Sequence, residues 1–156
     1  MKRKLKFLAV LIALTTVFTG CNKKVDNQKE EQQVKRLWEE TSSFAQNADW
    51  ENYAKCWSRS PNLQLLHPGS KEWLKGWEEF ASVYEKRIKL LSTATMHKNE
   101  FTVHVSQSGD LAWGIADVTF SFNPENVIHM WETVVCEKVE GEWKIVSVMA
   151  STVPDN

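Results

Sequence analysis

Apolar residues recur at helical spacing between residues 34 and 88. Most of them lie three or four positions apart, which places their side chains on one face of a helix. Asp49 is a suitable N-cap for the second helix, because its carboxylate can accept hydrogen bonds from free backbone N–H groups. The third helix is expected to begin at Ser70 or near Gly76. The predicted helices cover residues 34–48, 49–57 and 70–88.

The period changes to two after Lys89, which indicates β-strands. Phe101, Val103 and Val105 alternate with polar residues, and three longer strands follow. A shorter strand precedes the third helix. Helices followed by antiparallel strands indicate an α+β fold, with three N-terminal helices packed on one face of a curved antiparallel sheet. The predicted strands cover residues 63–67, 101–106, 111–122, 127–138 and 143–152.

The first 21 residues have the pattern of an export signal. Four basic residues precede an apolar run that ends at Leu14, which is shorter than the roughly 20 residues of a membrane-spanning helix. The ending Phe18-Thr19-Gly20-Cys21 resembles the lipobox of bacterial lipoproteins, in which the signal is cut before the cysteine. The resemblance implies a signal peptide over residues 1–20 and a Cys21 that carries lipid chains such as palmitate. An ordinary secretory signal with an incidental cysteine is the alternative.

Such an anchor implies a location in the cell envelope, on a membrane surface. Asn22 follows Cys21 in place of the Asp that often retains lipoproteins on the inner membrane of Gram-negative cells. In an envelope of that type, we therefore expect the outer membrane, facing the periplasm.

Residues 22–33 are polar and predict a tether, so that residues 21–33 form the lipidated cysteine and its linker. The end of this tether could wind into the first helix. Beyond residue 21 the chain has 15 Lys and Arg against 20 Asp and Glu, a formal charge of −5. This charge disfavours nucleic acid as a partner. Residues 34–154 have the length of one domain.

All eight tryptophans lie beyond residue 33. Each offers a large apolar surface and one N–H group that requires a partner when buried. So many tryptophans in a small domain indicate a lined cavity or an interface. A core that uses tryptophan is the simpler interpretation for those at helical spacing.

Five short motifs resemble the nuclear transport factor 2-like superfamily, and its SnoaL-like branch most closely. The resemblance extends over residues 34–152. The motifs are Asp49-Trp50, the Pro68-Gly69 turn, Gly76-Trp77-Glu78-Glu79-Phe80, Gly109-Asp110-Leu111-Ala112-Trp113, and Gly141-Glu142-Trp143-Lys144-Ile145-Val146 followed by Ser151.

The resemblance implies a cone in which helices and a bent sheet enclose a cavity. It also implies that the convex face of the sheet can form a homodimer. Members include isomerases, cyclases, hydratases and non-catalytic modules, so the fold alone does not give the function. The association domain of calcium/calmodulin-dependent kinase II carries an arginine and two histidines where this chain has Val134 and residues 147–149.

A two-residue loop at Glu140-Gly141 would set the register of the last hairpin, with Cys136 opposite Ile145 and Glu132 opposite Met149. By analogy with the family, the face holding Glu132 lines the cavity. Burial would then raise the pKa of Glu132 and suit it to acid or base catalysis. A solvated glutamate or a slipped register is the alternative. The residues expected at the cavity are Tyr53, Trp57, Trp77, Tyr84, Glu132, Ser147 and Met149, with His67 at its mouth.

The opposite face of this hairpin is too apolar to remain in water and suits a homodimer interface. Coverage by the tether or by the third helix is the competing interpretation. The residues expected on this face are Trp131, Thr133, Val135, Val146, Val148 and Ala150.

The four histidines lack the spacing of a metal site, so neither a metal nor another cofactor is expected. His67 could be catalytic or could only stabilise a turn. Cys56 and Cys136 could form a disulfide or remain two buried thiols.

Three functional hypotheses remain. The first is a non-catalytic module that binds a small, largely apolar molecule, with Glu132 as its polar contact. The second is a SnoaL-like enzyme of the isomerase, cyclase or hydratase type that uses Glu132 or His67 for proton transfer. The third is an assembly module whose cavity is filled by its own tryptophans.

Overall fold

Three helices and two short strands make up the first half of the described chain in the computed structural model, and long strands make up the second half. The structure describes residues 25–68 and 70–154. The signal peptide and Cys21 predicted above lie outside these residues. In chain order the elements are α2 (Asn27–Gln46), α3 (Trp50–Lys55), β1 (Gln64–Leu66), β2 (Leu74–Lys75), α4 (Gly76–Leu91), β3 (Thr95–Val105), β4 (Leu111–Asn123), β5 (Asn126–Val139) and β6 (Glu142–Thr152).

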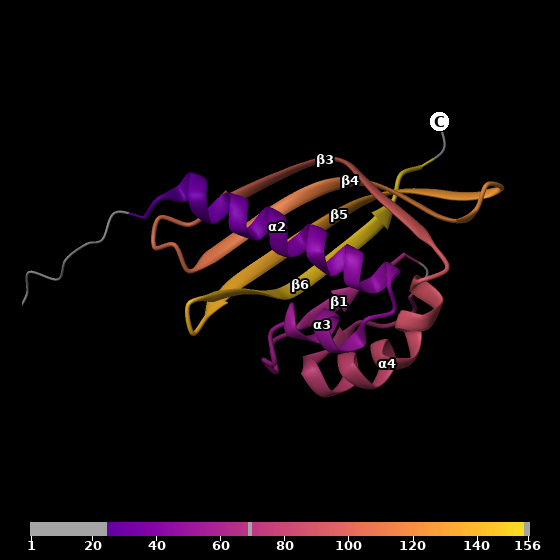
Figure 1. The fold of residues 1–156 in the computed structure, drawn as a ribbon, viewed down its shortest axis with the longest axis horizontal. Coiled ribbons are helices and arrows are strands. Elements are labelled where there is room, and N and C mark those ends of the chain that lie inside the picture. The colour runs from indigo at the N-terminus through magenta and orange to yellow at the C-terminus, as the bar shows by residue number, and fades with distance from the viewer. Residues whose placement is uncertain (1–24, 69, 155–156) are drawn as a thin grey trace, which may run out of the picture.

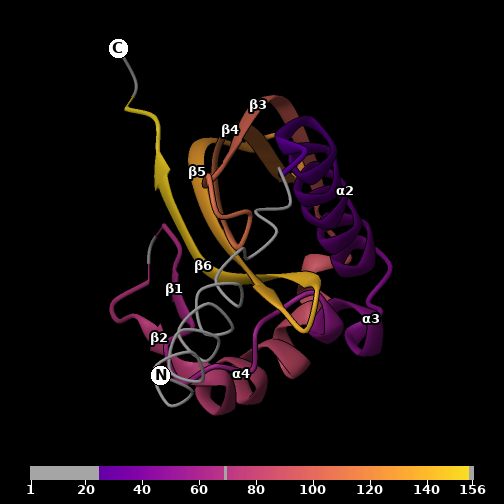
Figure 2. The same cartoon turned by 90° about the vertical axis from the view of Figure 1, so that its left-hand side faces the viewer.

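The strands form one curved six-stranded sheet in the order β2-β1-β6-β5-β4-β3. Neighbouring strands are antiparallel except β1, which runs parallel to β6. Figure 1 shows α2 lying across the long strands, with α3 and α4 gathered at one end of them. The view turned by 90° shows the curvature of the long strands, with α2 lying beside them (Figure 2). The predicted α+β class and curved sheet are thus confirmed.

Helix α2 begins at Asn27, where the Asp26 side chain caps it by accepting a hydrogen bond from the backbone N–H of Lys29. The last residues of the predicted tether are therefore helical. Glu30 fastens this first part of the helix to the β5–β6 hairpin, because its Oε2 accepts from Lys138 Nζ at 2.6 Å and from Trp143 Nε1 at 2.7 Å. Further along, one face of α2 is buried. Its buried residues are Val34, Trp38, Thr41 and Ala45.

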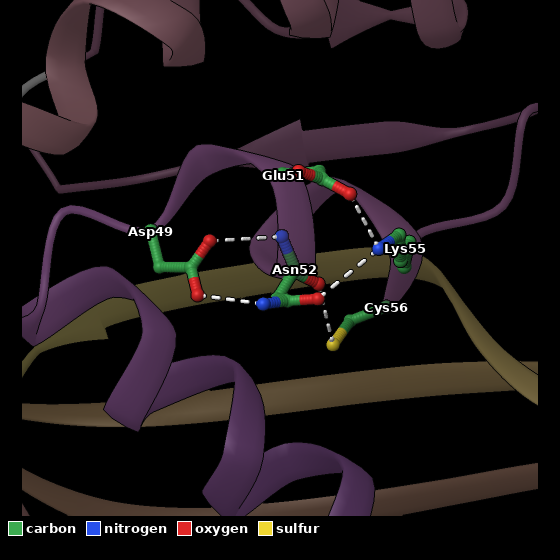
Figure 3. Close-up of polar contacts among 5 residues, drawn as sticks. All are labelled: Asp49, Glu51, Asn52, Lys55 and Cys56. Carbon is green, nitrogen blue, oxygen red and sulfur yellow. Dashed lines mark hydrogen bonds and ion pairs between the residues drawn. The ribbon is translucent and has the colours of Figure 1, made fainter.

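Helix α3 is short and is held by its own side chains. Asp49 accepts from the backbone and side-chain nitrogens of Asn52, at 3.1 and 2.7 Å, as predicted for an N-cap (Figure 3). On its outer side, Lys55 bridges Glu51 and Asn52. The inner side presents Tyr53, which is buried. A six-residue helix has few internal hydrogen bonds, so this cap helps fix the direction of Tyr53.

A bulge in β6 changes the predicted register. Cys136 pairs with Ile145 as expected, but the next pair is Val135 with Ser147, which leaves Val146 as the extra residue. Beyond the bulge, Glu132 pairs with Ala150 instead of Met149. Side chains alternate between faces, so one extra residue reverses every later position of β6. Val148 and Ala150 therefore face the interior and are buried, whereas Met149 is exposed.

Gly114 lets α2 approach the sheet closely. A Cβ atom at this position would lie 2.6 Å from the carbonyl oxygen of Thr102 and 3.0 Å from the Trp38 ring. Only glycine leaves room there for the indole, which packs edge-on against Phe101 with ring centroids 5.7 Å apart. Trp38 is consequently held deep between helix and sheet. None of the helices in the described part of the chain is long and apolar enough to cross a membrane.

Candidate functional site

A cavity of about 190 Å³ lies between the helices and the concave side of the sheet. Its wall includes Tyr53 and Trp57 from the α3 region, Tyr84 from α4, Glu132 from β5, and His67 after β1. It is smaller than the roughly 300–1,000 Å³ of typical ligand pockets, so it suits a small molecule. The structure thus brings five of the predicted site residues together around one space.

Glu132 is the carboxylate of this cavity and is only 7 % exposed. Its strand neighbours on the same face, Met130 and Val134, are buried and apolar. Oε1 accepts a hydrogen bond of 2.6 Å from Trp38 Nε1. Within the described residues no cation lies at ion-pair distance from it. A buried carboxylate with one recorded donor is costly to the fold, which is typical of a group kept for function.

Trp38 was not among the predicted site residues, although it is the residue that holds Glu132. Its backbone oxygen accepts from Lys98 Nζ at 3.3 Å, and the same ammonium contacts Ser42 Oγ and lies 5.3 Å from the centre of the indole ring. Burial lowers the pKa of Lys98, while the charge of Glu132 acts in the opposite direction. The helical spacing of Trp38 predicted its burial, but nothing in the sequence paired it with a residue 94 positions away.

An aromatic cluster lies beside the cavity, and three of its members, Tyr53, Trp57 and Tyr84, line the cavity. The rings of Tyr53 and Tyr84 are nearly parallel with centroids 6.1 Å apart, and Phe80 stacks on Tyr84 at 4.7 Å. Trp57 packs against Phe80 with ring centroids 4.4 Å apart. Tyr84 and Trp57 are 1 % and 4 % exposed, yet Tyr84 Oη and Trp57 Nε1 have no hydrogen-bond partner among the described residues. Two buried polar atoms without hydrogen-bond partners are costly to the fold.

Three ionisable groups at the cavity, Tyr53, His67 and Tyr84, favour their uncharged forms. Burial raises the pKa of the Tyr53 hydroxyl and of the Tyr84 hydroxyl, and the charge of Glu132 adds to both effects. Burial and the nearby Arg87 guanidinium lower the pKa of His67 to about 4. His67 is therefore neutral near pH 7. Arg87 also lines the cavity, with its guanidinium 5.7 Å from the centre of the Tyr84 ring.

Three predicted cavity residues do not contribute to this wall. Trp77 lies outside it and stacks on Trp50, with ring centroids 6.3 Å apart. The Arg59 guanidinium lies 4.2 Å from the centre of the Trp77 ring. Ser147 and Met149 were assigned to the inner face by a register that the bulge at Val146 overturns. Met149 is 47 % exposed on the opposite face.

A second hollow of about 440 Å³ is an open groove between α2, α3 and the β5–β6 hairpin. Two of its cations are already paired, Lys55 with Glu51 and Lys144 with Glu142. Neither Tyr84 nor Trp57, whose buried polar atoms lack partners, is among the residues that line it. Among the described residues, no three His, Cys, Asp or Glu side chains gather in a way that could hold a metal ion. Cys56 and Cys136 are both free and buried.

The family model described as SnoaL-like domain matches residues 34–156. A search of curated proteins found no match.

Many solved structures share the fold at low sequence identity. A proposed dehydratase of the nuclear transport factor 2-like family from Streptomyces avermitilis has 18% identity and a TM-score of 0.68, with 82% of this chain and 99% of that chain covered. A nuclear transport factor 2-like superfamily protein from Salmonella enterica has 18% identity and a TM-score of 0.67, with 83% of this chain and 94% of that chain covered. A proposed calcium/calmodulin-dependent protein kinase II association domain from Xanthomonas campestris has 20% identity and a TM-score of 0.65, with 79% of this chain and 87% of that chain covered. At such identities the likeness concerns the fold alone.

Proposed function

The chain belongs to the SnoaL-like domain family, and we propose that its cavity binds a small, largely apolar molecule without transforming it. The observation that carries this proposal is the buried Glu132 carboxylate on an apolar wall, held by Trp38 and facing a space that side chains leave unfilled. Pockets of this composition bind through apolar surface and use a few polar groups for orientation. Glu132 would be that polar contact.

Native mass spectrometry of the full chain, purified without denaturation, tests this proposal. We expect a species that carries extra mass, and we expect Glu132→Ala to lose that mass. Glu85→Ala is the matched control, because Glu85 lies exposed on α4 away from the cavity wall. A chain that carries no extra mass and binds no added apolar compound would contradict the proposal.

A catalytic role is the second candidate, because Glu132 and His67 line the same cavity. In such an enzyme of the isomerase, cyclase or hydratase type, one of them would transfer a proton. A pKa of about 4 leaves His67 a weak base near neutral pH, which favours Glu132 for this role. A candidate substrate should then give a pH-dependent rate that Glu132→Gln abolishes. Binding of the compound without turnover would support the non-catalytic role instead.

The assembly hypothesis requires tryptophans that fill the cavity. Trp38 and Trp57 line it but leave about 190 Å³ between the side chains, which favours a bound molecule over a solid core.

Membrane anchoring is a further part of the proposal and rests on the lipobox-like sequence that ends at Cys21. The domain would be tethered to a cell-envelope membrane, the outer membrane facing the periplasm in a Gram-negative cell. Cys21→Ser should move the protein from the membrane fraction to the soluble fraction and abolish labelling by a palmitate analogue. Unchanged labelling would contradict this assignment.

A homodimer through the outer face of the sheet completes the proposal. After correction for the bulge, adjacent strands carry Trp113, Ile115, Trp131 and Met149 on this face, and each is between 43 % and 54 % exposed. Apolar side chains gathered in this way on a sheet mark an interaction surface. A second copy would present the same surface and bury both.

A further inference from the structure

The chain before α2 is fixed to one end of the sheet. A Cβ atom on Gly109 in the β3–β4 turn would lie 2.8 Å from a side-chain carbon of Val25, so these two residues are in close contact. Next along the chain, Glu30 accepts hydrogen bonds from two side chains of the β5–β6 hairpin. The first described residues therefore lie beside two turns, residues 106–110 and 140–141, which define the N-terminal end of the sheet.

Only a short piece of chain separates this end from the cysteine that is proposed to carry lipid. Cys21 precedes Val25 by four residues. An extended chain spans at most about 3.6 Å per residue, so the two residues can lie no more than about 14 Å apart. The connection is this short because α2 begins at Asn27, within the segment that was expected to be a tether.

The far end of the sheet is the β4–β5 turn, residues 123–126. Strand β4 runs from Leu111 at the N-terminal end to Asn123 at the far end, and its 13 residues span about 40 Å. Figure 1 shows the two ends on opposite sides of the molecule, with the start of α2 at the left and the β4–β5 hairpin at the right.

The cavity lies in the half of the sheet that is remote from the start of α2. Glu132 pairs with Ala116 near the middle of β4, and the other lining residues of the two strands lie nearer the far end. Leu90 and Phe122 line the cavity and are also exposed, so they mark where it meets solvent. The lining residues from β4 and β5 are Phe120, Phe122, Ile128, Met130 and Glu132.

On the basis of the proposed lipid anchor, we propose that the N-terminal end of the sheet faces the membrane and that the cavity opens away from it, toward the aqueous compartment. The surface that meets the lipid headgroups is then formed by the β3–β4 and β5–β6 turns. A connection of at most about 14 Å keeps this end at the bilayer, whereas the far end lies about 40 Å further out. A ligand reaches the cavity from water and not from the acyl chains.

Charge disfavours a domain that lies on its side. Beyond residue 21 the chain carries 15 Lys and Arg against 20 Asp and Glu, a formal charge of −5, and anionic lipids repel such a surface. The exposed side of α2 includes Glu39 and Glu40. The apolar outer face of the sheet is the alternative membrane contact, and it would bring both ends of the sheet equally close to the lipid.

Energy transfer to labelled lipid headgroups measures the orientation. The full lipidated chain is reconstituted into vesicles of phosphatidylcholine and phosphatidylglycerol that carry an acceptor dye on their headgroups. A donor dye is attached at Gln107→Cys in the β3–β4 turn or at Glu125→Cys in the β4–β5 turn, and both residues are exposed. We expect at least about twofold more transfer from position 107, because position 125 lies about 40 Å further from the bilayer.

Two controls accompany this measurement. The unsubstituted chain gives the background from Cys56 and Cys136, which are buried thiols. Insertion of about 12 Gly and Ser residues between Lys24 and Val25 adds a mean reach of about 20 Å, so the transfer from the two positions should become more alike.

The outcomes separate the orientation from the anchor on which it rests. Equal transfer from the two positions, or more from position 125, overturns the orientation, as does a difference that the longer connection leaves unchanged. If vesicle attachment is nevertheless lost in Cys21→Ser, the anchor stands without the orientation. A full chain that does not attach to vesicles overturns both.

Discussion

At the level of single residues, the proposed site requires that Glu132 remain buried in the folded protein. One hydrogen bond from Trp38 and the distant charge of Lys98 are the compensation available among the described residues. Removal of one partner of a buried hydrogen bond leaves the other unsatisfied, whereas removal of both can be nearly neutral. Substitutions of Trp38 and Glu132 should therefore have non-additive effects on the free energy of unfolding.

A double-mutant cycle measures this coupling. Trp38→Phe alone should lower the free energy of unfolding by about 1–3 kcal/mol, beyond any packing loss, because Glu132 loses its donor. In the background of Glu132→Leu, the same change should cost less by about 1 kcal/mol or more. Urea denaturation of the four proteins gives the values. Costs of Trp38→Phe that agree within about 0.5 kcal/mol in the two backgrounds would show that the bond is unimportant.

The sequence located part of the site at this scale. Tyr53, Trp57 and Tyr84 follow helical spacing, and the structure places them at the cavity with His67 and Glu132. Trp77 shares the helical period but stacks on Trp50 and does not line the cavity. Periodicity identifies the buried stripe of a helix but does not tell which of its residues border a cavity. The ligand-binding role of all these residues stays a prediction.

At the scale of elements, the β6 bulge is the departure from expectation that most affects the site. In addition, α2 and β3 begin earlier than predicted, and β2 was not predicted. Leu111–Asn123, Asn126–Val139 and Glu142–Thr152 agree closely with the predicted strands, because alternation and turn residues are local signals. The bulge at Val146 does not follow from the local sequence. Ile145 also exchanges backbone hydrogen bonds with Cys56 and Ser58, so β6 accommodates partners on two sides. No pattern within the hairpin discloses that constraint.

The first turns of α2 give the second prediction. Hydrogen bonding to Lys138 lowers the pKa of Glu30 below its ordinary 4.5. A lowered folded-state pKa means stability that is present above the unfolded-state pKa and lost as pH falls through the folded value. Glu30→Gln should therefore lower the free energy of unfolding by about 1 kcal/mol near pH 7. The difference from wild type should shrink as pH falls below about 4.5.

Thermal unfolding from pH 7 to pH 3 checks this behaviour. Glu39→Gln is the control, because Glu39 lies exposed on the same helix. A deficit of Glu30→Gln that persists unchanged at pH 3 would mean that the carboxylate charge is not what fastens the helix.

At the scale of the whole molecule, the sheet has two apolar faces. The inner face packs on the helices, and the outer face leaves Trp113, Ile115, Trp131 and Met149 exposed. The sequence predicted that an apolar outer face would exist, but the bulge changed its membership from Val148 and Ala150 to Met149. A second copy is the partner that we propose for this surface.

Native mass spectrometry over a range of concentrations tests this surface. The full chain should be a dimer, and Trp131→Asp should weaken it by about 2 kcal/mol or more, roughly thirtyfold in dissociation constant. Trp73→Asp is the control, because Trp73 is similarly exposed but lies on the loop before β2. A wild-type chain that stays monomeric throughout would rule out the dimer.

A crystal structure of the full chain, purified without denaturation, decides whether the cavity beside Glu132 holds a small molecule. We expect density for a compact molecule inside the cavity, with a polar atom within hydrogen-bond distance of Glu132. A cavity closed by rotated side chains, or one that holds only water, would contradict the proposed binding function.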